Sequence, residues 1–212
     1  MSKEAVLAQL DVSRAQDNVK GVDISGLDLT QCDISETSTE MLKGERVILR
    51  GGILDLAYFL DADFTAANLE GASCGQTAFF DCVLYQVISP DADYSYAKLS
   101  ASNCDYSNFS TCEFDNANLW ASTFVGCDLS DATLTYVEAA DACFDDANLT
   151  NADLSNGNFT GTMFRKTNLT GADLSHGNFT NCDFTGATLT DVCWDNAILK
   201  NAKFDAGTQP NK

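Results

Sequence analysis

Residues 147–189 read ANLTNADLSNGNFTGTMFRKTNLTGADLSHGNFTNCDFTGATL, and a large apolar residue returns at every fifth position of this stretch. A small residue precedes each of them by two positions, and polar residues fill most of the remainder. The large apolar residues, which we call centres, are Leu149, Leu154, Phe159, Phe164, Leu169, Leu174, Phe179, Phe184 and Leu189. A repeat this regular is typical of a fold built by stacking one structural unit.

A period of five fits neither common secondary structure, because an amphipathic helix repeats every 3.6 residues and a half-buried strand every two. If the centre and the small residue two positions before it both point inward, the remaining residues of the unit can turn a corner. A large residue at the small position would collide with its neighbours in so thin a core. The pattern therefore predicts a solenoid with one centre on each side of a coil.

The same phase extends from Ile24 to Phe204, and the centres that are not hydrophobic are Thr39, Gly44 and Ser89. Centres that lie 20 residues apart resemble one another, which indicates four units per coil. One such column contains Phe64, Phe124, Phe144, Phe164, Phe184 and Phe204.

The motif of a small residue, Asn or Asp, Leu or Phe and two polar residues resembles the pentapeptide-repeat family over most of the chain. The resemblance implies an all-β fold, a right-handed quadrilateral β-helix, here of about 8–9 coils. We expect one elongated domain at residues 19–206, with a short N-terminal helical cap and lead-in at 1–18 and a polar tail at 207–212.

Three segments outside the regular repeat carry their own predictions. Ser2 can cap a helix that runs to about Leu10 and covers the first coil. Residues 36–46 have no apolar centre, so we expect a projecting loop, which either occupies two faces loosely or leaves the coil. Residues 85–91 contain a proline, which cannot donate to a strand ladder, so a bulge or small loop is predicted there.

The residues that usually carry chemistry follow the repeat. Of the nine cysteines, most fill inward positions and only two are expected to face outward. The inward ones are Cys32, Cys74, Cys82, Cys104, Cys112, Cys127 and Cys182, and the outward ones are Cys143 and Cys193. His176 falls at an outward corner without a nucleophile beside it. Asp153 and Asp173 stack and can attract a cation, but no further ligands converge. We therefore predict no enzyme activity, no metal site and no cofactor.

The formal net charge is −19. Between Gly51 and Ala197 the bases are Lys98, Arg165 and Lys166, and Arg165 is predicted to stack on an aspartate one coil earlier. Direct binding to nucleic acid or to an anionic membrane is therefore not expected. The acidic surface either keeps a stacked sheet soluble or is functional. The acidic residues that we single out are Asp93, Glu113, Asp115, Asp153, Asp173 and Asp195.

The sequence shows neither the apolar core of a signal peptide after its first residues nor a run of about 18 apolar residues. We expect a cytoplasmic protein. Its last coil holds Trp194, Leu199 and Phe204, followed by a polar stretch. An uncovered end of this kind favours a homodimer through the C-terminal coil, and fraying or a crystal contact is the alternative.

Several large apolar residues fall at outward or corner positions on one side of the predicted rod. They are Tyr58, Leu60, Phe80, Tyr96, Trp120 and Tyr136. A cluster of this kind is typical of a docking surface for a protein partner. The alternatives are that the projecting loop or the N-terminal helix covers them, or that they are there because they favour strand conformation.

The predicted shape and charge are similar to those of the Qnr and MfpA group of pentapeptide-repeat proteins. That resemblance implies a DNA mimic that binds DNA gyrase and topoisomerase IV, and hence quinolone resistance. The alternative function is a scaffold or adaptor that holds a protein partner through the apolar residues, for example in a secretion or signalling assembly. A purely structural rod is the third hypothesis.

Overall fold

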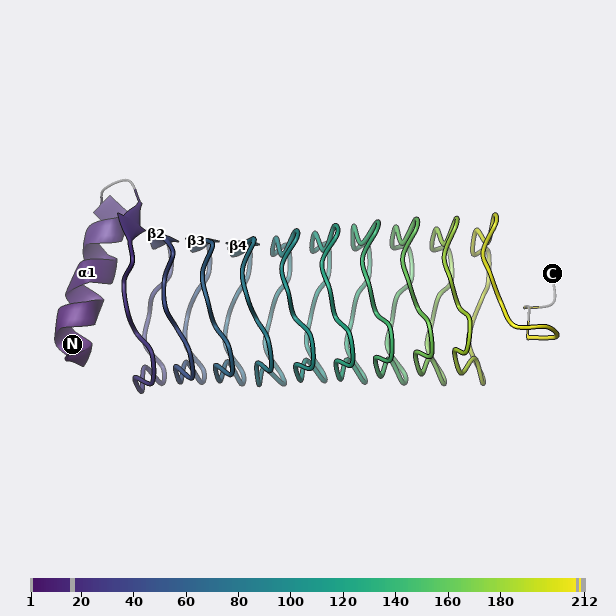
Figure 1. The fold of residues 1–212 in the computed structure, drawn as a ribbon, viewed down its shortest axis with the longest axis horizontal. Helices are drawn as coiled ribbons and strands as arrows, with labels where there is room; N and C mark the ends of the chain where they lie inside the picture. The colour runs from purple at the N-terminus through teal and green to yellow at the C-terminus, as the bar shows by residue number, and fades with distance from the viewer. Residues whose placement is uncertain (1, 16–17, 209, 211–212) are drawn as a thin grey trace.

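The computed structural model describes residues 2–15, 18–208 and 210, which form a long rod with a helix at its N-terminal end (Figure 1). Helix α1 spans Lys3–Ala15. The strands are β1 Val19–Lys20, β2 Ser38–Glu40, β3 Tyr58–Leu60 and β4 Ala78–Phe80. They pair in that order in one parallel sheet.

Each coil of the rod takes 20 residues. Thr39 pairs with Phe59, and Phe59 pairs with Phe79. Single parallel bridges with the same separation continue on every side of the rod, as far as Asp183 with Lys203. The predicted four-sided β-helix with a 20-residue coil is therefore confirmed.

Backbone hydrogen bonds join each coil to both of its neighbours. The N–H of the centre Phe144 donates forward to the carbonyl of Met163 at 2.8 Å, and the N–H of Met163 donates back to the carbonyl of Ala142 at 3.0 Å. The same two bonds recur along each side of the rod, so the ladder satisfies most of its backbone polar groups.

The corners are tight turns with a positive φ. Ala147 donates its N–H to the carbonyl of Phe144 at 3.2 Å, and Asp146 between them has a φ of 57°. A positive φ at the third residue defines a type II turn and favours Gly or Asn, which other corners carry, as at Asn151 and Gly161. The sequence pattern marks these corners only as polar positions.

Stacked rings fill the core. The rings of Phe164 and Phe144 lie 5.4 Å apart with a 9° angle between their planes, and Phe164 and Phe184 lie 5.1 Å apart at 2°. Small inward residues add hydrogen bonds between coils, since the Thr167 hydroxyl donates to the Phe144 carbonyl at 2.6 Å. The same-residue columns seen in the sequence are therefore physical stacks.

Helix α1 covers the open end of the first coil, as the sequence predicts (Figure 1). Val6 and Leu10 are buried, and the Ala5 N–H donates to the Ser2 hydroxyl at 3.3 Å, which caps the helix. The helix ends at Ala15 and not near Leu10, because its last turn is anchored to the first coil. Arg14 supplies that anchor by donating to the carbonyls of Asp33 and Ser35 at 2.7 and 2.8 Å.

The predicted projecting loop at residues 36–46 is wrong, because this segment continues the coil. Thr39 lies inward on β2 and is fully buried, although its hydroxyl has no hydrogen-bond partner among the described residues. Gly44 also points inward, and a Cβ there would lie 3.0 Å from the Phe64 ring. A small centre is tolerated here because the phenylalanine of the next coil fills its space.

The predicted bulge or loop at residues 85–91 is also wrong. Ser89 takes a centre position, where its hydroxyl bonds the buried Tyr94 hydroxyl at 2.8 Å. Pro90 fits because the ladder does not use the amide at this position of the unit. The equivalent N–H of Glu70 instead donates to the Asn68 side chain at 3.0 Å.

Replacing Thr39 by Val tests its inward position. The change removes a buried hydroxyl that has no partner and keeps the shape of the side chain, so we expect the free energy of unfolding to rise by about 1 kcal/mol. Urea unfolding followed by circular dichroism measures it. No change in the unfolding midpoint would place the hydroxyl in water, as in a projecting loop.

Phe164→Ala and Met163→Ala test the facing of neighbouring residues. Loss of the stacked Phe164 ring should lower the free energy of unfolding by about 3–5 kcal/mol. Met163 lies on the outer surface, and its truncation should cost less than about 1 kcal/mol. Equal shifts in the urea midpoints of the two variants would contradict the facing.

Candidate interaction surfaces

The cysteines of the rod are structural. Burial raises the pKa of four thiols to about 12, namely Cys82, Cys112, Cys127 and Cys182. Such thiols stay protonated at neutral pH and are poor nucleophiles. Cys143 lies at an outward position, as expected. Its side chain is nevertheless buried, because Thr123 and Met163 flank it in the ladder.

The described residues contain no set of three His, Cys, Asp or Glu side chains that could hold a metal ion. Asp153 and Asp173 are paired in the ladder, as predicted. Each carboxylate accepts the N–H of the serine two residues later, Ser155 at 2.9 Å and Ser175 at 2.8 Å. One oxygen of each carboxylate is therefore occupied by a hydrogen bond within the protein.

The acidic residues singled out in the sequence all lie on one side of the rod. This side has Tyr94, Phe114, Leu154 and Trp194 among its inward centres, and we call it the acidic face. The five-residue units that form it, from Cys32 to Asn196, contain no lysine or arginine. Its acids are the six singled out in the sequence, together with Asp33, which is paired with Arg14, and Glu36 and Asp55.

The carboxylates of the acidic face are fixed by the backbone to different degrees. Asp93 accepts the N–H of Ser95 at 2.7 Å, and Asp115 bridges to the next coil by accepting the hydroxyl and the N–H of Thr135. Glu113 and Asp195 make no side-chain hydrogen bond to a described residue. The face therefore carries both rigid and freely solvated negative charge.

The negative charge is not needed for the turn bond that these aspartates make. On other sides of the rod, Asn168 and Asn178 accept the corresponding N–H groups of Thr170 and Thr180 at 3.1 Å. At Asp173, burial pushes the pKa upward, but hydrogen bonds from Ser175 and Cys193 bring the pKa below its ordinary value of 3.8. Asp173 is therefore ionised at neutral pH.

Elsewhere on the rod, acids stack on bases. Arg165 donates to the Asp145 carboxylate through Nε at 2.9 Å, which confirms the predicted pairing across coils. The same contacts raise the pKa of Arg165. Similarly, Arg50 meets Glu70 at 3.0 Å. The acidic face lacks such neutralising partners along most of its length.

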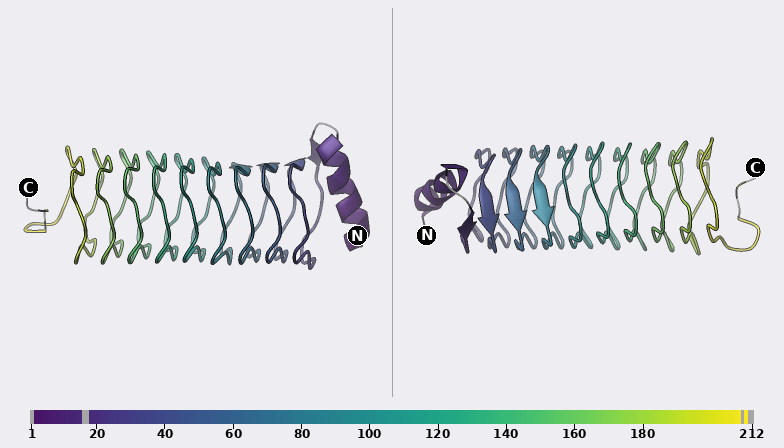
Figure 2. Two further views of the ribbon diagram at one scale, coloured as in Figure 1. Left: turned by 180° about the vertical axis from the view of Figure 1, so that it is seen from behind. Right: turned by 90° about the horizontal axis from the view of Figure 1, so that it is seen from above.

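A second surface lies on the side that carries β2, β3 and β4, whose arrows lie next to one another in Figure 2. Tyr58, Leu60 and Phe80 are half-buried there, and the rings of Tyr58 and Phe80 lie 5.7 Å apart. Leu56 and Met41 are 53% and 56% exposed at the two flanking corners. We call these five residues the apolar face.

The other predicted docking residues are more scattered. Trp120, Tyr96 and Tyr136 are 52%, 57% and 58% exposed. Ser100 separates Trp120 from Phe80 in the same column, so these residues do not form one continuous patch. Neither of the two segments that could have covered these residues does so, because α1 lies over the end of the rod and residues 36–46 lie within the coil.

Sequence reasoning missed the apolar corners Met41, Leu56 and Tyr106, which are all more than half exposed. Each has a φ between 55° and 62°, a conformation in which large apolar residues are uncommon. Their position in the sequence could have indicated this exposure, because the residue two positions after a centre forms a corner in every unit.

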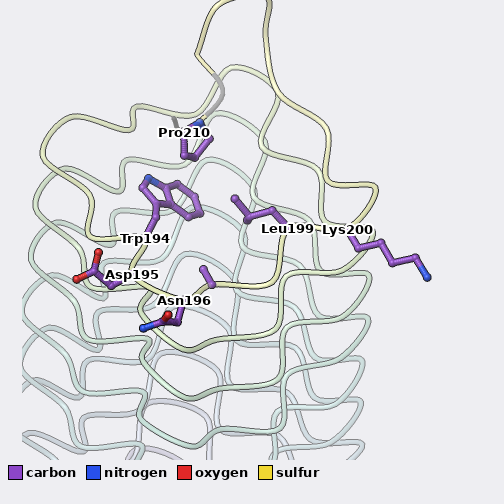
Figure 3. A pocket seen from close by; sticks show the side chains of 7 residues that line it. Trp194, Asp195, Asn196, Leu199, Lys200 and Pro210 are labelled. Atoms are coloured by element: carbon purple, nitrogen blue, oxygen red, sulfur yellow. The ribbon is translucent and has the colours of Figure 1, made fainter. Parts of the chain in front are cut away.

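The C-terminal end of the rod has a hollow of 610 Å³. Trp194, Leu199 and Pro210 line it (Figure 3). Trp194, Leu199 and Phe204 are only half-buried, whereas the same columns are fully buried in the middle of the rod. Residues 209, 211 and 212 of the predicted tail lie outside the described residues, and dimerisation through this end stays a prediction.

The geometry defines a solenoid of five-residue units, and comparison with known proteins gives its family. The family model described as Pentapeptide repeats (8 copies) matches residues 92–131, 112–151 and 142–181. Residues 92–181 of the chain match the pentapeptide-repeat family, as the motif predicts. A comparison with curated proteins finds no match.

Solved structures share the fold. QnrB1, a plasmid-mediated fluoroquinolone resistance protein, is similar at a TM-score of 0.50 and 19% identity, over 90% of this chain and 83% of that one. HetL, a pentapeptide repeat protein involved in heterocyst differentiation regulation from the cyanobacterium Nostoc sp. strain PCC 7120, is similar at 0.45 and 20% identity. That match covers 99% of this chain and 100% of HetL. At 19% identity the likeness to QnrB1 shows the fold alone.

Among the described residues, no helix combines the length and the apolar character that a membrane crossing needs.

Asp173→Asn separates charge from structure. The amide oxygen can still accept the Ser175 N–H, so we expect stability at neutral pH within about 0.5 kcal/mol of wild type. The low pKa of Asp173 means that its carboxylate stabilises the fold above about pH 4, and that this stability is lost as the pH falls through the folded pKa.

Urea midpoints between pH 7 and pH 3 test this expectation. The wild type should lose more stability on acidification than Asp173→Asn, and Asp173→Ala should already lose about 0.5–1.5 kcal/mol at pH 7. Parallel curves for wild type and Asp173→Asn would contradict the account.

Proposed function

We propose that this chain is a non-enzymatic, protein-binding solenoid whose acidic face imitates the phosphate backbone of DNA. The observation that carries the proposal is the absence of lysine and arginine from the units of this face, whereas on other sides Glu70 and Asp145 stack on Arg50 and Arg165. Coils about 4.8 Å apart set the spacing of the carboxylates along the rod. In B-DNA, successive phosphates of one strand advance by about 3.4 Å.

The partner of such a face is a protein that binds DNA through a basic groove. The first candidate is a type II topoisomerase, DNA gyrase or topoisomerase IV, because the sequence resembles the Qnr and MfpA group. The fold shared with QnrB1 is compatible with this partner. The charge pattern of the acidic face supports it independently of that likeness.

Two properties of the side chains support binding without catalysis. The buried thiols have a raised pKa, and His176 lies at an exposed corner. Neither provides the activated nucleophile that covalent catalysis needs.

The alternative function is a scaffold or adaptor that holds a protein through the apolar face. The contact between Tyr58 and Phe80 on an exposed surface favours it. The two functions use different sides of the rod, so variants can separate them.

The test of DNA mimicry compares two variants of equal charge. In the first, the acidic face is neutralised by Asp93→Asn, Glu113→Gln, Asp115→Asn, Asp153→Asn, Asp173→Asn and Asp195→Asn. In the control, the same number of charges is removed from other sides by Asp23→Asn, Asp28→Asn, Asp63→Asn, Asp128→Asn, Asp141→Asn and Asp183→Asn.

Displacement of labelled duplex DNA from gyrase measures binding. Wild type and control should displace the duplex with a steep salt dependence, whereas the neutralised variant should be weaker by at least about tenfold. Equal loss in both variants would show that only net charge matters, and no displacement by wild type would contradict this partner.

A further inference from the structure

We propose that the apolar face binds an amphipathic helix of another protein, with lysine or arginine along one edge of that helix. This site lies on the side of the rod next to the acidic face, with Leu56 at the corner between the two sides, and it does not depend on DNA mimicry.

The apolar face is a flat surface built from adjacent coils. Ladder pairs hold its residues in register, with Tyr58 beside Ala78 and Leu60 beside Phe80. Met41 donates its N–H to the Leu60 carbonyl at 2.8 Å, which fixes that corner against the next coil. The apolar side chains therefore project from a rigid support.

The spacing of the coils suits a helix that lies along the rod. Side chains of neighbouring coils are about 4.8 Å apart. Side chains three or four residues apart on one helix face are about 5–6 Å apart, so successive turns can sit between successive coils. The face of the sheet offers no unpaired backbone edge, which disfavours an added strand.

The charges around the apolar face select a basic partner. Asp61 and Asp81 follow Leu60 and Phe80 directly, are exposed, and form no ion pair with a described residue. Glu36 lies in the corner column of Leu56 on the other edge.

Three bases lie near the apolar face, and one of them is Lys43, which lies between Asp23 and Asp63 in the ladder of the neighbouring side. Lys20 at one end is paired with Glu40 at 2.7 Å, and Lys98 follows Ala78 at the other. A second copy of the chain would bring its own net charge of −19 against these carboxylates, so self-association through this face is disfavoured.

Three designed peptides of equal length test the proposal by fluorescence anisotropy. The stripe peptide is a helix of leucine, alanine and lysine with one leucine stripe and lysines along one edge of it. The scrambled peptide has the same composition without a stripe, and the acidic peptide carries glutamate in place of lysine. The full chain is used throughout.

The stripe peptide should bind wild type at least about tenfold more tightly than the scrambled peptide. Leu60→Ser with Phe80→Ser should remove this preference, and so should Leu56→Ser, which leaves the strands intact. Thr160→Ser with Thr180→Ser is the matched control on the same side of distant coils and should bind as wild type does. Asp61→Lys with Asp81→Lys should favour the acidic peptide instead.

Three results would overturn the proposal. The first is equal binding of the stripe and scrambled peptides, or of the stripe and acidic peptides, by wild type. The second is loss of the stripe peptide in the neutralised acidic-face variant, which would make the contact a general charge effect. The third is a dimer of the chain alone that Leu56→Ser abolishes, which would assign this face to a second copy. Failure of DNA mimicry alone would leave the proposal standing.

Discussion

The structure depends on the registration of each coil against the next at a separation of 20 residues. A centre donates its N–H forward to the following coil, and the residue before a centre donates its N–H back, so a shift in one coil would break bonds on both sides. The same registration places Phe144, Phe164 and Phe184 in one stack. Backbone pairing and core packing therefore enforce a single arrangement, in the way expected of repeat proteins.

Registration also determines the surface. The outward residues of one column are ladder neighbours, so a property repeated every 20 residues becomes a continuous strip. Asp153 and Asp173 illustrate this on the acidic face, and Leu60 and Phe80 on the apolar face. The residues that form these two surfaces point outward and do not contribute to the core. Evolution or mutagenesis can therefore change one surface with little effect on the other or on the fold.

Much of this arrangement was predictable from the sequence because the repeat is so regular. The coil length and the contact of Arg165 with Asp145 follow from spacing alone, and the capping helix follows from Ser2 and the residues after it. The two segments that were wrongly predicted as loops are those in which a centre is not hydrophobic. Thr39 and Ser89 remain inside because the inward position is set by the ladder, and a Tyr94 hydroxyl gives Ser89 a partner. Such compensation involves pairs of neighbouring units that a single-unit motif does not describe.

The apolar corners show a second limit of pattern reasoning. Leu56 and Met41 adopt a positive φ that their residue types rarely favour, and the surrounding ladder imposes it. The acidic residues lie on one side because the 20-residue register of the ladder places them in one set of units, as it pairs Asp93 with Glu113.

Dipolar distance measurements between spin labels test the stacking of coils most directly. Labels on unnatural amino acids at Thr30, Ser130 and Thr190 lie in one outward column, and the nine native cysteines stay unmodified. With coils about 4.8 Å apart, the distance from position 30 should grow by about 14 Å between the second and third labels. Distances that do not grow with sequence separation would contradict the stacked rod.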